Sequence, residues 1–315
     1  MKKLDCLFVH PTTHIKTPFS SQEDSVIYVV MPMGTIALAD LLRKEGYETK
    51  IVHTGMEHLR NRDFDVEGIL KGHADVVGID LHWYCHSYDA IRIAEVTKKV
   101  SDSFVVLGGF TASYFAEEIL SHFESVDAVI KGDAEAPLLE LMRHRRKAEF
   151  SEVPNLIYRD GESLKRSQKT YVAEASDLER LNFSNLCLLE GFDEYRRNLS
   201  QFGHLDPSHV KARLKTQGWL CIGRGCSVNC SYCGGGSDSF EVLTGRTDPI
   251  FRPVAKVIET LARFEEMKIS CAYMDFDPYP SNRKYYYELF RSIQREKIDI
   301  SAQFLMWSLS DREFI

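Results

Sequence analysis

The sequence predicts an α/β protein, with an N-terminal doubly wound parallel sheet of Rossmann-like type followed by the first half of a partial (β/α) barrel. Short apolar segments alternate with amphipathic helical patterns over residues 1–145, and this alternation resumes at residue 216. Strands that alternate with helices indicate βαβ units and a mainly parallel sheet. Residues 146–215 lack the alternation, so we predict two α/β domains, 1–145 and 216–315, joined by a linker.

In the first domain we predict strands at residues 4–9, 49–53, 76–81, 104–107 and 128–131. The segments between them contain helical patterns, at residues 38–45, 87–100, 111–123 and from Pro137 onward. The first of these helices has Arg43 and Lys44 in its last turn and Gly46 just beyond, which is a typical helix end. In such sheets, ligands bind beyond the carboxyl ends of the strands. The loops that follow the strands are therefore the expected site.

The linker contains one predicted β-hairpin, because Asp160-Gly161 separates two β-prone segments. In the second domain we predict strands at 219–222, 270–276 and 300–307, with a helix starting at Pro253. Three βα units of about 30 residues fit this length, whereas a closed eight-unit barrel takes about 250 residues. We therefore expect a fragment of a longer protein; the alternative is a partner that completes the half-barrel.

Composition and charge exclude several classes of protein. The chain has 315 residues, 44% of them hydrophobic and 27% charged, with a net charge of −7. This is the composition of a globular protein, and it does not favour a general binder of nucleic acid or anionic membranes. No apolar segment approaches the length of about 18 residues that a membrane-spanning helix needs, and no signal-peptide core follows the N-terminal lysines. We expect a cytoplasmic protein with neither membrane nor nucleic-acid partners.

The most informative motif is a group of cysteines, Cys226, Cys230 and Cys233, spaced C-x₃-C-x₂-C and followed by Gly234-Gly235. Thiolates bind iron–sulfur clusters, and only three of them would leave one iron of a [4Fe–4S] cluster open to a substrate. One alternative is a zinc site with Cys221 as the fourth ligand, although Cys221 lies in a predicted strand. Another is that these cysteines are small buried residues, the role expected of Cys6, Cys85, Cys187 and Cys271.

With an aromatic residue, Tyr232, before its last cysteine, and a strand ahead of it, this motif resembles that of the radical S-adenosylmethionine (SAM) superfamily. The resemblance covers residues 216–315. It implies that Cys226, Cys230 and Cys233 are the metal ligands and the catalytic centre. They would hold a [4Fe–4S] cluster whose open iron binds SAM and cleaves it reductively to methionine and a 5′-deoxyadenosyl radical.

The same resemblance implies SAM contacts. Tyr232 would lie near the adenine, and Gly234 and Gly235 next to the cluster. The family has a Gly-rich segment after its second strand that contacts the methionine amino group. The corresponding residues here include Asp275 and Asp277 and no Gly pair, so these carboxylates are the candidates for that contact.

Three segments of the first domain are similar to the cobalamin (B12)-binding domain that is fused to such barrels: residues 32–47, 105–111 and 126–135. The similarity implies that the corrin lies on the loops at the strand ends, where glycines allow the backbone to approach a large flat ligand. The implied cobalamin contacts are Pro32, Gly34, Thr35, His82, Gly108, Gly109, Phe110 and Gly132.

One feature departs from a related group of cobalamin proteins, which carry D-x-H-x-x-G after the first strand to supply a histidine ligand to cobalt. Here the first strand ends in His10-Pro-Thr-Thr-His14, without that motif. Asp80-Leu-His82 has the spacing of Asp and His, but it follows the third strand and has Cys85 in place of Gly. We therefore expect either no histidine on the cobalt or a corrin that His82 faces.

Together the two resemblances imply a cobalamin-dependent radical SAM enzyme that transfers a methyl group to an unactivated centre of a small-molecule substrate. A second SAM would remethylate the cobalamin, and an external donor such as flavodoxin or ferredoxin would supply electrons. Two alternatives stay open. One is a methylthiotransferase-like enzyme without cobalamin, with a second cluster in the first domain. The other is a non-catalytic fragment that binds cobalamin or the cluster.

Overall fold

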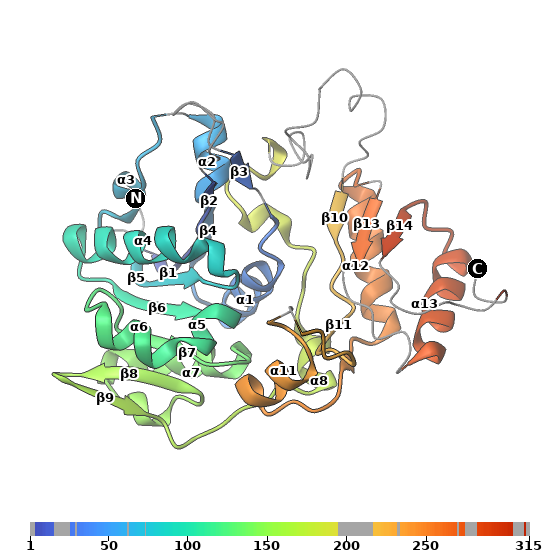
Figure 1. The fold of residues 1–315 in the computed structure, drawn as a ribbon. Coiled ribbons are helices and arrows are strands. Elements are labelled where there is room, and N and C mark those ends of the chain that lie inside the picture. Colours follow the sequence, from blue (N-terminus) through green and yellow to red (C-terminus); the bar gives the residue numbers. More distant parts are fainter. Residues whose placement is uncertain are drawn as a thin grey trace. The chain divides into compact units, whose positions relative to one another are not determined.

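The computed structural model of the chain describes residues 4–15, 26–28, 30–61, 63–72, 74–194, 217–231, 234–269, 271–274, 282–304 and 312. The chain forms two compact units (Figure 1). The first consists of Met1–Val172 and Asn185–Phe192, and the second of Ala173–Ser184 and Asp193–Ile315.

The first unit contains a seven-stranded sheet in the order β4-β1-β5-β6-β7-β8-β9. Five neighbouring strands are parallel: β1 (Leu4–His10), β4 (Thr49–His53), β5 (Ala74–Asp80), β6 (Phe104–Gly108) and β7 (Ala128–Ile130). Each lies within two residues of a strand predicted from the sequence, so the parallel α/β architecture is confirmed.

The strand order reverses at β1, which lies between β4 and β5. Helix α1 (Met33–Lys44) connects β1 to β4, and α4 (Ser87–Val100) connects β5 to β6. Because βα crossovers are right-handed, the reversal places these two helices on opposite faces of the sheet. The sheet is therefore doubly wound, with its topological switch point between β1 and β5, where such folds bind ligands.

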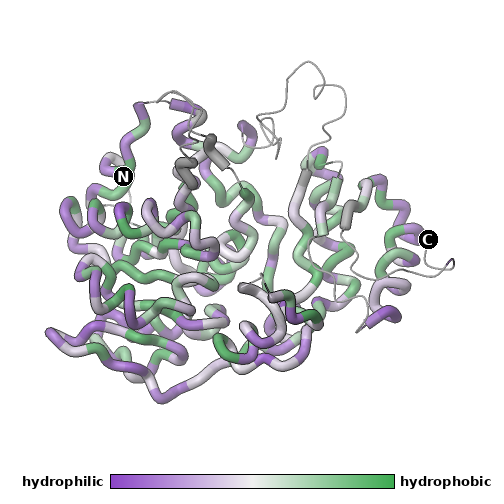
Figure 2. Tube along the Cα trace, viewed as in Figure 1, coloured by the Kyte–Doolittle hydropathy of each residue, from purple (hydrophilic) through white to green (hydrophobic). Residues whose placement is uncertain are grey.

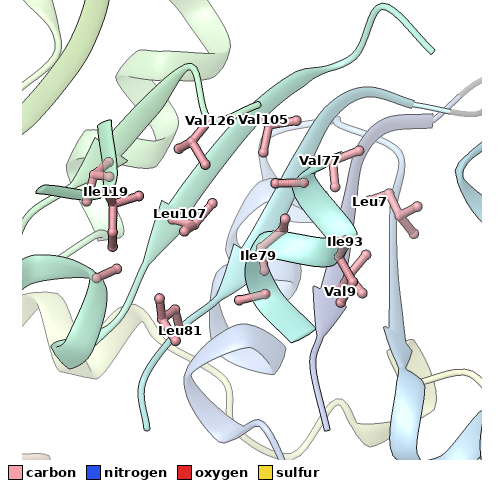
Figure 3. Packing of buried hydrophobic residues seen from close by; sticks show 14 of the residues in the cluster. Leu7, Val9, Val77, Ile79, Leu81, Ile93, Val105, Leu107, Ile119 and Val126 are labelled. Carbon is pink, nitrogen blue, oxygen red and sulfur yellow. The ribbon is translucent and has the colours of Figure 1, made fainter. Parts of the chain in front are cut away.

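One face of this sheet packs against α3 (Val66–Leu70), α4, α5 (Phe110–Tyr114) and α6 (Ala116–His122). Alternate strand residues supply this core, including Leu7, Val9, Val77 and Ile79, and Ile93 of α4 packs onto them (Figure 3). Hydrophobic residues accordingly lie along the strands, and hydrophilic residues along the outer surfaces of the helices (Figure 2). The core fixes the strand ends on which the candidate site is built.

One helix prediction was wrong in detail, because the single helix expected at 111–123 is divided into α5 and α6 at Phe115. The Ser113 hydroxyl donates to the Gly109 carbonyl (2.8 Å) and accepts from the Gly132 amide (2.9 Å). Serine side chains that bond back to the preceding turn compete with helix geometry and bend helices. The same contacts bring the turn after β7 against α5.

The predicted hairpin around Asp160-Gly161 is present as β8 (Leu156–Asp160) and β9 (Ser163–Arg166), with Gly161 at φ +61°. It extends the first sheet, because β8 pairs antiparallel with β7. The boundaries at 145 and 215 stay a prediction. The unit also contains β2 (Thr13–Ile15), β3 (Val26–Tyr28), α2 (Thr54–Arg60), η1 (Tyr84–His86), α7 (Glu135–His144), η2 (Arg145–Lys147), η3 (Phe150–Glu152) and η4 (Leu186–Leu188).

The second unit contains a parallel three-stranded sheet in the order β10-β13-β14. Its elements are α8 (Ala175–Arg180), β10 (Gln217–Trp219), β11 (Gly223–Arg224), α11 (Ser237–Thr244), β12 (Ile250–Phe251), α12 (Val254–Glu266), β13 (Cys271–Met274), α13 (Arg283–Arg295) and β14 (Ser301–Phe304). Helices α12 and α13 link successive strands, as expected for the start of a (β/α) barrel. Across the described residues of both units, the helices are too short or too polar to cross a membrane.

Candidate functional site

The predicted cobalamin contacts lie at the carboxyl-end loops of the first sheet. Pro32 is the N-cap of α1, and Gly34 and Thr35 lie in its first turn. The others follow their strands directly: His82 comes after β5, Gly108 to Phe110 span the end of β6 and the start of α5, and Gly132 comes after β7. Two contacts connect these loops: the Thr35 hydroxyl donates to Asp80 at the end of β5 (3.4 Å), and the ring centroids of His82 and Phe110 are 5.6 Å apart. The structure thus gathers these residues on one edge of the sheet.

The Gly108-Gly109 turn has a backbone that only glycine accommodates at its second position. Gly109 has φ +104°, and an added Cβ would lie 2.8 Å from the amide nitrogen of His82 and from the carbonyl carbon and oxygen of Leu81. The Thr111 hydroxyl also donates to the His82 carbonyl (2.8 Å). The loops after β5 and β6 therefore interlock through backbone atoms, which fixes the position of His82.

Sequence reasoning missed a polar cluster across the switch point. His10, the last residue of β1, hydrogen-bonds through Nδ1 to Oδ2 of Asp80, the last residue of β5, at 2.9 Å. The Thr35 hydroxyl donates to the same oxygen at 3.4 Å. The rings of His53 and His86 lie 4.6 Å and 5.2 Å from that of His10, measured between centroids. The sequence does contain one indication of this cluster, because β1, β4 and β5 each end in an ionisable residue.

The electrostatics of this cluster favour neutral His53 and His86 side chains beside an ionised Asp80 carboxylate. Burial and the neighbouring His10 hold the pKa of His53 well below its usual value, and the same two causes lower the pKa of His86 to about 4. Burial raises the pKa of Asp80, but the hydrogen bond with His10 and the nearby histidines outweigh it, so its pKa ends below normal. His53 is further fixed because its Nε2 donates to the Val30 carbonyl (3.1 Å).

This edge of the sheet has the properties of a site for a large polar ligand. Buried side-chain atoms without a hydrogen-bond partner among the described residues include three at this edge: His10 Nε2, His86 Nδ1 and Thr12 Oγ1. Buried polar atoms are normally satisfied, so unpaired ones need an explanation. At Gly34 and Gly108, an added Cβ would have no neighbour within 4 Å, which leaves the backbone open to close approach. The exposed backbone at Gly34 and Gly108 would allow a corrin ring to approach closely, and the unpaired polar atoms could bond to the amide groups at the edge of the corrin.

In the second unit, Cys226 and Cys230 lie in the loop that follows β11, and both are partly exposed. The Cys226 sulfur accepts a hydrogen bond from the Val228 amide (3.4 Å). Gly225, at φ +101°, lies so close to Pro249 that a Cβ would be 2.9 Å from its Cα. Gly234 and Gly235 form the turn before α11, and Gly234 is open to solvent. Two accessible thiols in a tightly turned loop suit metal ligation, and the Val228 amide would stabilise a thiolate.

Four of the predicted residues, Cys233, Tyr232, Asp275 and Asp277, lie outside the described residues. Within the described ranges, no group of three His, Cys, Asp or Glu side chains is placed to hold a metal ion. Cys221, the alternative fourth ligand, lies beyond the end of β10 and not within it, and its sulfur faces the Gly223 carbonyl (3.6 Å).

A buried arginine anchors the start of this loop. Arg252 is 1% exposed, and it donates to the carbonyls of Cys221 (2.7 Å) and Lys256 (3.2 Å) and to the Thr260 hydroxyl (3.2 Å). Its guanidinium lies over the Phe183 ring, 4.7 Å from the centroid, and burial lowers its pKa. The hydrogen bonds tie the strand end before the cysteines to α12.

We expect Arg252→Met to lower the free energy of unfolding by about 3 kcal/mol, because each buried acceptor left without its donor costs roughly 1–3 kcal/mol. Chemical denaturation would measure the change. Arg263→Met, on the exposed side of α12, removes only a surface ion pair with Glu266 and is the matched control. Equal effects of the two substitutions would contradict the anchoring role.

Comparison with known proteins supports a cobalamin site in the first unit. Residues 24–142 match the B12 binding domain family. The chain is 25% identical over 285 residues to an uncharacterized methyltransferase of Pyrococcus horikoshii, a match that covers 89% of this chain and 55% of that protein. It is also 25% identical over 264 residues to the hopanoid C-3 methylase of Methylococcus capsulatus, covering 82% and 44%. The chain therefore spans about half the length of these relatives.

Solved structures share the fold over nearly the whole chain. The radical SAM methyltransferase TsrM from Kitasatospora setae, solved with tryptophan and a SAM analog, superposes with a TM-score of 0.66 at 17% identity, covering 93% of this chain and 51% of that one. The cobalamin-dependent SAM radical enzyme OxsB gives a TM-score of 0.63 at 13% identity, covering 95% and 38%. Residues 24–142 are therefore a B12-binding domain, and the chain as a whole shares the fold of TsrM and OxsB.

Proposed function

We propose that the chain is the cofactor-binding part of a cobalamin-dependent radical SAM methyltransferase, which methylates an unactivated carbon or phosphorus of a small molecule. One observation carries the proposal: a B12-binding domain precedes a C-x₃-C-x₂-C loop that follows the first strand of a parallel βα array. Neither part alone implies this reaction. The proposal is supported by the fold, which the chain shares with TsrM, solved with cobalamin and a [4Fe–4S] cluster, and with OxsB, solved with aqua-cobalamin and SAM.

The first unit would hold cobalamin at the carboxyl edge of its sheet. Gly34 and Gly108 leave room for the corrin, and Gly109 fixes the turn beside it. The unpaired atoms of His10, Thr12 and His86 are available for polar contacts with the ligand.

The second unit would hold the [4Fe–4S] cluster on Cys226, Cys230 and Cys233. The Val228 amide would stabilise the Cys226 thiolate, and Arg252 would keep the strand end before the loop in place. Bound there, the cluster would supply the electron that cleaves SAM and the cobalamin would supply the methyl group. We propose that an external donor such as flavodoxin or ferredoxin reduces the cluster. We place the protein in the cytoplasm, because thiols stay reduced there.

Reconstitution tests the cofactor assignment. The chain would be expressed anaerobically, loaded with iron, sulfide and hydroxocobalamin, and assayed for metals and for its absorbance spectrum. We expect about four irons for one cluster, together with one cobalt per chain. About eight irons without cobalt would indicate the methylthiotransferase-like alternative with two clusters. Zinc in place of iron would overturn the cluster, and metal binding without SAM cleavage would favour a binding fragment.

Stoichiometry tests the reaction itself. If a methyl group is transferred by this route, two SAM are consumed for each methylated product, one cleaved to 5′-deoxyadenosine and one demethylated to S-adenosylhomocysteine. Both products would be quantified with candidate small-molecule substrates, using full-length protein. 5′-Deoxyadenosine formed without any methylated product would exclude methyl transfer and favour another radical reaction.

A further inference from the structure

Asn155 directly precedes β8 and lies beyond residue 142, where the match to the B12 binding domain family ends. Its backbone is left-handed, with φ +57°. Asn is one of the few residues with a side chain that adopt this conformation readily, and glycine adopts it without strain. The backbone at this position therefore accepts either residue, and what Asn adds to glycine is a side-chain amide.

Every polar atom of Asn155 makes a hydrogen bond. Its Nδ2 donates to the carbonyls of Tyr171 (2.7 Å) and Asp133 (3.3 Å), and its Oδ1 accepts from the Tyr171 amide (2.9 Å). Its backbone amide donates to the Lys169 carbonyl, and its backbone carbonyl accepts from the Lys131 amide, both at 3.0 Å. The residue therefore joins two segments that are far apart in the sequence, the turn after β7 and the segment that leaves β9.

The turn after β7 (residues 132–134, the β7 turn) contains Gly132, a predicted cobalamin contact. Gly132 has φ +81°, and its amide donates to the Ser113 hydroxyl (2.9 Å), which itself donates to the Gly109 carbonyl (2.8 Å). The β7 turn ends at Ala134, the N-cap of α7, which has no side chain that could cap the helix. The β7 turn is therefore held by side chains from outside it, Ser113 on one side and Asn155 on the other.

We propose that Asn155 is a positioning residue for cobalamin, because its side-chain amide holds the β7 turn in the conformation that presents Gly132 to the corrin. The proposal rests on the proposed function, and it extends the cobalamin-binding unit beyond the matched residues to the hairpin and Tyr171. A loop that is already ordered loses less freedom when its ligand binds, so its order contributes to affinity.

Ser167 separates this positioning role from mere support of the hairpin. Its side chain is buried, and its hydroxyl donates to the Ser151 carbonyl (2.9 Å) and accepts from the Lys169 amide (3.2 Å). These bonds hold the same segment after β9 that Asn155 holds, but they do not involve the β7 turn. Ser167→Ala is therefore the matched control, which removes side-chain bonds of the same kind and leaves the turn in place.

Cobalamin binding and hydrogen exchange test the proposal together. The chain and its variants would be titrated with hydroxocobalamin, and exchange of the backbone amides of residues 131–136 would be followed by mass spectrometry with and without it. In the wild-type chain we expect bound hydroxocobalamin to slow this exchange. Asn155→Gly keeps the left-handed backbone without strain and removes the side-chain bonds. We expect it to speed exchange in the β7 turn and to weaken hydroxocobalamin binding roughly tenfold, on the scale of one lost hydrogen bond.

For Ser167→Ala we expect a loss of stability in chemical denaturation, with binding and exchange in the β7 turn within about twofold of wild type. If hydroxocobalamin binds the wild-type chain without slowing exchange in residues 131–136, the proposal is overturned and the proposed function stands, whether or not a variant folds. Binding by Asn155→Gly at wild-type strength, or an equal loss of binding in Ser167→Ala, would have the same meaning. A wild-type chain that binds no hydroxocobalamin would overturn both.

Discussion

Cys226→Ala is expected to abolish iron binding and SAM cleavage, because three thiolates are the minimum for the proposed cluster. Changes to residues that merely support metal ligands already cost about 10–100-fold in affinity or activity, so loss of a direct ligand should cost more than about 100-fold. Iron content and 5′-deoxyadenosine release from SAM, measured anaerobically after reconstitution, would show the effect.

Cys187→Ala is the matched control for this substitution. Cys187 is exposed in the first unit, where its thiol lies 2.9 Å from the Asn185 side-chain oxygen. We expect its removal to leave iron content and SAM cleavage within twofold of wild type, on the order expected for surface substitutions. If Cys226→Ala retained wild-type iron, the cysteine loop would not be the cluster site.

Gly109→Ala is expected to lower the free energy of unfolding by about 3 kcal/mol or more, since the backbone region it occupies costs other residues roughly 1–3 kcal/mol before any clash. The added methyl would also lie 2.8 Å from backbone atoms of Leu81 and His82. Backbone atoms cannot rotate away as a side chain does, so the loop after β5 must move. Chemical denaturation would measure the stability, and cobalt retention the effect on the site.

Gly108→Ala separates the effect of the turn on stability from its effect on cobalamin binding. An added Cβ at Gly108 would contact nothing within 4 Å, so we expect a stability change within about 0.5 kcal/mol, as for an open surface position. If the corrin approaches this backbone, the same substitution should weaken cobalamin binding without weakening the fold. A loss of stability as large as that in Gly109→Ala would show that the turn is sensitive for another reason.

The sequence was sufficient for the parallel strands of the first unit, because buried strands are continuous apolar segments between clear helix signals. It also placed the glycine turns, since Gly108-Gly109 directly follows such a segment. It missed the antiparallel pair of strands β11 and β12, because a strand of two residues is too short to show a periodic pattern. The predicted strand at 219–222 accordingly lies two residues earlier, at β10, and leaves Cys221 in the connection.

The polar cluster could not be predicted, because its members come from distant parts of the chain. His10 and Asp80 are 70 residues apart, and their contact follows from strand order, which apolar patterns do not specify. Once β1 and β5 are known to be neighbours, the contact follows from register, since Val9 pairs with Ile79. The general lesson is that polar residues at strand ends should be compared across every plausible pairing of strands.

The segment Asn185–Phe192 has a consequence for how the chain is made. It returns to the first unit after twelve residues of the second, Ala173–Ser184, and forms a parallel bridge between Leu189 and Ile51 on the outer strand β4. Asn185 also donates to the Asp40 carboxylate on α1 (2.7 Å). During synthesis, the edge of β4 therefore stays uncovered until residue 192 leaves the ribosome. A protein cut at residue 172 would keep that edge bare, and we expect it to associate with itself.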